Sequence, residues 1–120
     1  MIKILCPSTL AFAAAVLLFP SDTQAKDLDF SELVILHTEL SRSIDNNTAR
    51  MGRICEVDSN CTLENLCPLL RENLRLASDF KKATSVLYYK YKATTLEQLN
   101  RVEATYRSME ASSKRNCSNR

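Results

Sequence analysis

Apolar positions recur at intervals of three and four residues in three stretches of the chain, which is the spacing of a helix with one buried face. Asp29 or Ser31 can cap the helix of the first stretch. Its apolar face holds Phe30, Leu33, His37, Leu40 and Ile44. The spacing predicts a helix over about residues 29–45.

The second stretch begins after Thr62 or Asn65, both capable helix caps, and its apolar stripe continues to about residue 92. Pro68 fits best in the first turn of this helix. A break at Ser78-Asp79 would divide the stretch into two helices. One long helix and two shorter helices therefore both remain open.

The third stretch opens with Thr94 and Thr95, followed by Glu97 and Gln98 in the pattern of a capping box. Its apolar face is formed by Leu96, Leu99, Val102, Tyr106 and Met109. This pattern predicts a last helix that ends near Ser113.

Residues 45–60 lie between the first two stretches and contain Gly52, the single glycine of the chain. They are expected to form a long loop, with a short extended piece at Arg53–Val57. Sandwiches and barrels need many Gly- and Pro-rich turns, whereas this chain has one Gly and three Pro. The predicted fold class is therefore an all-α, small disulfide-stapled helical bundle, with either four helices or three helices of which the middle one is long.

Residues 1–25 have the pattern of a secretory signal peptide, with Lys3 near the start, an uncharged run from Leu10 to Phe19 and small residues at Thr23-x-Ala25. The run is shorter than the ~20 residues that span a bilayer. We therefore expect a signal peptide at 1–25, a helical domain at 26–120, and a secreted, extracellular protein.

Four cysteines remain in the expected domain: Cys55, Cys61, Cys67 and Cys117. An even number in a secreted chain predicts two disulfides, and three pairings are open. The spacing of Cys55, Cys61 and Cys67 does not resemble a structural zinc site, so no metal is expected. His37 lies on the apolar stripe and is expected to pack there rather than to activate a thiol.

Three Asn-x-Ser/Thr acceptors occur in the domain, at Asn46, Asn60 and Asn116, and all three are expected on exposed loops. Asn46 is the favoured glycosylation site, because Asn60 and Asn116 are each followed by a cysteine that a disulfide would constrain.

Charge is unevenly distributed along the domain. Residues 26–67 carry four Lys/Arg against eight Asp/Glu, a net charge of −4, and residues 68–120 carry eleven against five, a net charge of +6. This asymmetry is either an ordinary solvated surface or a means of selecting partners. No phosphate-binding loop, nucleophile–histidine constellation or paired-carboxylate motif is present, so an enzyme and a cofactor are not expected. A secreted chain is also not expected to bind nucleic acid.

The chain resembles the short-chain four-helix cytokines, and within them the interleukin-4/interleukin-13 family. The resemblance rests on SELVILHTEL in the first helix, NCTLENLCPLLRENL at the start of the second, and TLEQLNRVEATYRSMEASSKRNCSN at the end. It implies a secreted, glycosylated immune signal, most simply a monomer without stable membrane insertion, that bridges two cell-surface receptors. The family's cysteine in the first helix is absent here.

In that family an acidic residue of the first helix and basic residues of the third contact the alpha receptor chain. Glu32 matches the acidic position, and Lys81, Lys82, Lys90 or Lys92 could supply the basic partner. The alternatives are another secreted helical ligand, a small lipid or odorant carrier with an interior cavity, or a membrane-active defence peptide.

Overall fold

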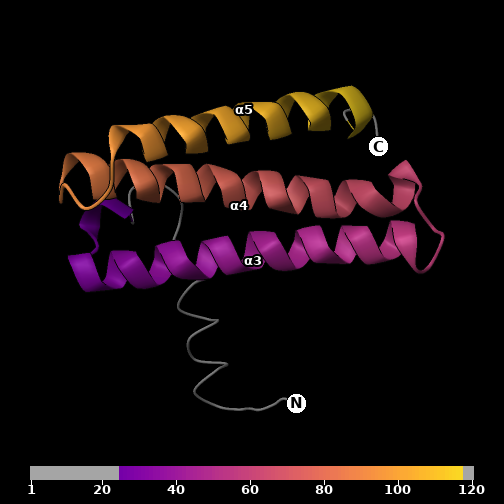
Figure 1. Cartoon of the computed structure of the whole chain (residues 1–120), viewed down its shortest axis with the longest axis horizontal. Coiled ribbons are helices and arrows are strands. Elements are labelled where there is room, and N and C mark those ends of the chain that lie inside the picture. The colour runs from indigo at the N-terminus through magenta and orange to yellow at the C-terminus, as the bar shows by residue number, and fades with distance from the viewer. Residues whose placement is uncertain (1–24, 118–120) are drawn as a thin grey trace, which may run out of the picture.

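The computed structural model describes residues 25–117, and these residues form three long α-helices and no strand (Figure 1). Helix α3 spans Phe30–Glu56, α4 spans Leu63–Tyr89 and α5 spans Leu96–Cys117. Successive helices run in opposite directions and are joined by short connections at residues 57–62 and 90–95. The prediction of a small all-α, disulfide-stapled bundle is confirmed, and the middle one of the three long helices is a single helix.

Helix α4 lies in the middle, with α3 packed along one side and α5 along the other (Figure 1). The core between α3 and α4 is aliphatic, and Leu33 on α3 has no exposed surface. The buried members of this cluster are Ala25, Leu28, Leu33, Leu40, Leu76, Ala83 and Leu87. Burial of these side chains is the main force that holds the helices together.

The expected end of the first helix was wrong, and so was the long loop that was expected to follow it. Helix α3 continues through residues 46–56, including the predicted extended piece, and ends at Glu56. The apolar spacing persists, because Met51 and Ile54 extend the face begun by Ile44 and are partly buried. Packing along α4 therefore outweighs the low helix propensity of the asparagines and of Gly52.

Helix α4 is unbroken, so the candidate break at Ser78-Asp79 does not occur. Thr62 is its N-cap, and the Thr62 hydroxyl accepts a hydrogen bond from the Asn65 amide at 3.2 Å. Pro68 is consequently the sixth residue of the helix rather than a first-turn residue. Proline is tolerated there because the carbonyl that it leaves without a donor belongs to Glu64, which is exposed.

The start of α5 agrees with the sequence pattern, since the Thr95 hydroxyl accepts a hydrogen bond from the Gln98 amide at 3.1 Å. The helix runs beyond the expected end at Ser113 and stops at Cys117. The predicted signal peptide lies outside the described residues except for Ala25, which is buried. Between residues 25 and 117, none of the helices has both the length and the apolar character needed to cross a bilayer.

Candidate functional site

The first turn of α3 is held by reciprocal hydrogen bonds between Asp29 and Glu32. The Asp29 carboxylate accepts from the Glu32 amide at 2.8 Å, and the Glu32 carboxylate accepts from the Asp29 amide at 3.1 Å. This is a capping box, and it fixes the position of Glu32 on the surface. Glu32 is exposed, and its negative charge lies at the positive end of the helix dipole.

Large apolar side chains are exposed on the same two turns of α3. Ile35 is 50% exposed, Phe30 is 45% exposed and Val34 is 39% exposed. The Phe30 ring meets the Tyr91 ring edge to face, with centroids 5.4 Å apart. Ile35 is three residues from Glu32 and is its neighbour on the helix surface, whereas Phe30 and Val34 are two residues from Glu32 and lie on another side of α3.

The end of α4 is attached to the segment that precedes α3. The Lys90 ammonium donates to the Lys26 carbonyl at 3.1 Å, and the Tyr91 hydroxyl donates to the Leu28 carbonyl at 3.0 Å. Helices α3 and α4 are antiparallel (Figure 1), so the end of α4 lies beside the start of α3. Lys90, the C-cap of α4, is therefore at the same end of the bundle as Glu32 in the first turn of α3. Lys92 is also at this end, where its ammonium donates to the Tyr89 carbonyl at 2.8 Å.

The other two candidate lysines lie further along α4. The Lys81 ammonium is 4.5 Å from the centroid of the Tyr106 ring, so this side chain is directed towards α5. Lys82 is half-buried, one residue further along α4. The structure therefore brings Lys90 and Lys92 to the end of the bundle that holds Glu32, but it directs Lys81 to another helix.

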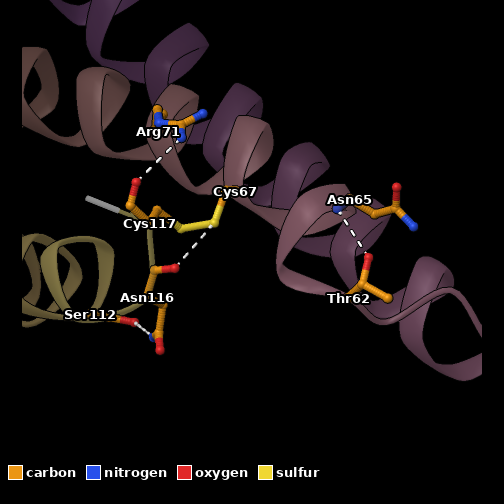
Figure 2. The surroundings of a disulfide bond; sticks show 7 residues. All are labelled: Thr62, Asn65, Cys67, Arg71, Ser112, Asn116 and Cys117. Atoms are coloured by element: carbon orange, nitrogen blue, oxygen red, sulfur yellow. Dashed lines mark hydrogen bonds between the residues drawn. A yellow bond between two sulfur atoms is a disulfide. The ribbon is translucent and has the colours of Figure 1, made fainter. Parts of the chain in front are cut away.

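The opposite end of the bundle holds the disulfide between Cys67 and Cys117 (Figure 2). Cys67 is 1% exposed and Cys117 is 3% exposed, and their Cα atoms are 5.7 Å apart. The Arg71 guanidinium donates to the Cys117 carbonyl at 3.3 Å (Figure 2). The bridge fastens the end of α5 to the second turn of α4 and is inaccessible to solvent.

The second disulfide joins Cys55 and Cys61 across the connection between α3 and α4. Backbone hydrogen bonds reinforce this turn, because the Asp58 amide donates to the Arg53 carbonyl and the Asn60 amide donates to the Ile54 carbonyl, each at 3.0 Å. Cys61 is exposed, in contrast to the buried bridge. The two predicted disulfides are thus present, with a pairing that the sequence left open.

Only one of the three glycosylation acceptors lies in a loop. Asn60 is exposed in the connection before α4, whereas Asn46 lies inside α3 and Asn116 lies in the last turn of α5. The Thr48 hydroxyl of the Asn46 acceptor donates to the Ile44 carbonyl at 2.9 Å. The expectation of loop positions was therefore wrong for Asn46 and Asn116, because both helices extend further than predicted.

His37 packs in the helix interface, as predicted. Its ring stacks on Phe80 with centroids 4.2 Å apart, and its Nε2 is 3.0 Å from the Thr84 hydroxyl. Burial lowers the pKa of His37, because the charged imidazolium is poorly solvated between the helices. His37 is therefore a packing residue that favours the neutral form.

Sequence reasoning missed a cavity that lies between α3 and α5. Ala77 is the signal that could have located it, because a small residue within the leucine-rich stripe of α4 leaves space between larger side chains. Within residues 25–117, no group of three or more His, Cys, Asp or Glu side chains is arranged to hold a metal ion. The chain matches no protein-family model, no curated protein and no solved structure.

Proposed function

We propose that this protein is a secreted helical cytokine that binds the ectodomain of a cell-surface receptor through the start of α3. Glu32 is the central charged contact, Ile35 supplies apolar contact area one helical turn away, and Lys90 contributes a positive charge at the same end of the bundle. The receptor class that we propose is an interleukin-4 receptor alpha-like chain, as the sequence resemblance implies.

The observation that carries the proposal is that Glu32 is exposed in the fixed first turn of α3, with the half-exposed Ile35 as its neighbour one helical turn away. Ile35 is 50% exposed and therefore offers apolar surface beside the Glu32 carboxylate. Protein interfaces combine such apolar centres with charged groups that speed encounter and select the partner. The surface is also well ordered before binding, because the capping box and the Lys90 and Tyr91 hydrogen bonds fix it.

The disulfides also support a stable extracellular ligand. The disulfides compensate for a modest core in a small domain, which is the usual strategy of secreted proteins. A lipid carrier is less well supported, since the cavity between α3 and α5 is about 230 Å³ and drug-sized ligands occupy about 300–1,000 Å³.

The test is surface-plasmon binding of the oxidised, secreted protein to the interleukin-4 receptor alpha ectodomain of the same species. A shared beta-chain receptor serves as the control surface. Saturable binding to the alpha ectodomain alone supports the proposal. Absence of binding to both receptors would refute the assignment to this receptor class.

The contact itself is tested with Glu32→Gln, which removes the charge but keeps an oxygen that can accept the Asp29 amide hydrogen bond. Loss of one partner of a buried interfacial charge pair costs about 2 kcal/mol or more, so affinity should fall by about thirtyfold or more. Asp58→Asn, a matched charge removal in the α3–α4 connection, should leave affinity unchanged. Unchanged binding by both Glu32→Gln and Glu32→Lys would eliminate the Glu32 contact.

A further inference from the structure

A cavity of about 230 Å³ lies on the face of the bundle where α3 and α5 flank α4. All three helices line it, so its shape depends on the complete bundle. Its apolar lining consists of Ile44, Ala77, Phe80, Val102, Tyr106 and Met109. The small side chain of Ala77 lies between the larger residues of the two flanking helices and leaves the space open.

The volume limits the kind of molecule that fits. An apolar protein cavity of ~150 Å³ accommodates benzene, and drug-sized pockets begin near 300 Å³. A cavity of about 230 Å³ therefore suits one small ring system with a short chain. Phe80 and Tyr106 line the cavity with aromatic rings, of which Phe80 is already stacked on His37 and Tyr106 has the Lys81 ammonium 4.5 Å from its centroid, so the remaining surface of each ring is what a ligand would contact. Met109 offers a sulfur atom that favours aromatic contact.

The polar groups of the cavity indicate the charge of the molecule that would fit. Asp45 lines the α3 side and makes no hydrogen bond or ion pair with the described residues, so its carboxylate is available to a ligand. Ser41 offers a hydroxyl on the same side. Arg101 lines the α5 side, but its guanidinium is paired with the Glu97 carboxylate at 3.3 Å. Asp45 is therefore the charged residue of the lining that has no partner among the described residues.

We propose that this cavity binds a small arylalkylamine, with the aromatic ring between Phe80 and Tyr106 and the ammonium group on the Asp45 carboxylate. The ring is removed from water, and the ammonium forms a charge-assisted hydrogen bond at the open side. This site is separate from the surface around Glu32, so ligand binding at the cavity can be tested independently of receptor binding.

Three indole compounds test the proposal on the full oxidised domain. Tryptamine carries a positive charge, indole-3-propionate carries a negative charge on a chain of similar length, and indole carries neither. Binding is measured by two-dimensional amide NMR titration and by calorimetry. Tryptamine should bind saturably and shift signals of Ala77, Val102 and Met109, and indole-3-propionate should bind about tenfold more weakly, because it lacks the charge-assisted hydrogen bond.

Variants locate the site. Asp45→Asn should weaken tryptamine binding about tenfold and leave indole binding unchanged, because only the amine uses the carboxylate. Asp58→Asn is the matched control and should bind tryptamine as the wild type does. Ala77→Leu should abolish binding of both compounds by filling the cavity, and Val102→Phe, at a half-buried position on α5, provides the same test if Ala77→Leu does not fold.

Several results would overturn the proposal. Binding of indole-3-propionate as tight as that of tryptamine would show that Asp45 does not select the charge, and tighter binding of indole-3-propionate would show that Arg101 does. Signal shifts confined to residues outside the cavity would show that the compounds bind elsewhere. Unchanged tryptamine binding by a folded cavity-filling variant, or by Asp45→Asn, would remove the physical basis of the site.

Discussion

The two disulfides close chain loops of very different length, and their contributions to stability should differ accordingly. Cys67 and Cys117 are 50 residues apart in sequence, whereas Cys55 and Cys61 are 6 apart. A disulfide stabilises the folded state mainly by reducing the entropy of the unfolded chain, and the effect grows with the logarithm of the loop length. At 25 °C the chain-entropy model gives about 4 kcal/mol for the long loop and about 2 kcal/mol for the short one.

Each bridge is removed by replacing both of its cysteines with alanine. Alanine is preferred to serine because Cys67 and Cys117 are buried, and a buried hydroxyl without a partner would add its own cost. Urea unfolding at 25 °C, followed by circular dichroism, gives the free energy of unfolding of each variant. The Cys67→Ala/Cys117→Ala variant should lose about 4 kcal/mol, and the Cys55→Ala/Cys61→Ala variant about 2 kcal/mol.

Since small domains have total stabilities of about 5–15 kcal/mol, loss of the long-range bridge should leave the fold marginal. Equal losses for the two variants, or a larger loss for the short loop, would refute the entropic reasoning. Such a result would mean that local native contacts, such as the turn hydrogen bonds of Asp58 and Asn60, dominate the effect of the bridge between Cys55 and Cys61.

Two further predictions concern single residues of α3. Gly52 lies within the helix with nothing within 4 Å of the position that a β-carbon would take, so Gly52→Ala should raise the free energy of unfolding by about 0.5–1 kcal/mol. A lower unfolding free energy in the same urea assay would contradict this expectation. His37 has a lowered pKa in the folded protein, so the unfolded chain binds its proton first as the pH falls. The contribution of His37 to the free energy of unfolding should be complete above its ordinary pKa near 6.5. It should be lost as the pH falls from there through the lower pKa that His37 has in the folded protein. The His37→Gln variant should lack this part of the pH dependence, and parallel stability profiles of the two proteins between pH 7 and pH 5 would show that His37 is not responsible.

The helical class and the starts of the helices could be predicted because they depend on local signals. Asp29, Thr62 and Thr95 cap the three helices, and each was among the predicted caps. The ends could not be predicted in the same way. Gly52 and the neighbouring polar residues resemble a loop, although the partly buried Met51 and Ile54 continue the apolar spacing of the helix through them.

The candidate site was predicted in part. The family resemblance singled out Glu32, but the sequence could not show that Ile35 remains exposed beside it, because an isoleucine in an amphipathic segment can equally be buried. The sequence also could not determine which candidate lysine lies near Glu32, because this depends on which sides of α4 face α3 and α5. Disulfide pairing was equally open, because spacing along the chain does not determine which sulfur atoms meet in the fold.

The position of the disulfides determines which parts of the molecule can be separated by a single proteolytic cut. The bridge between Cys67 and Cys117 makes α4 and α5 one covalent ring, so cleavage of any peptide bond between those residues leaves one molecule until it is reduced. Helix α3 is outside this ring, and the bridge between Cys55 and Cys61 closes a separate small one. A cut within residues 62–66 would therefore separate the whole of α3 covalently from the other two helices, and a cut within α3 before Cys55 would separate its exposed first turn, because neither bridge spans these segments.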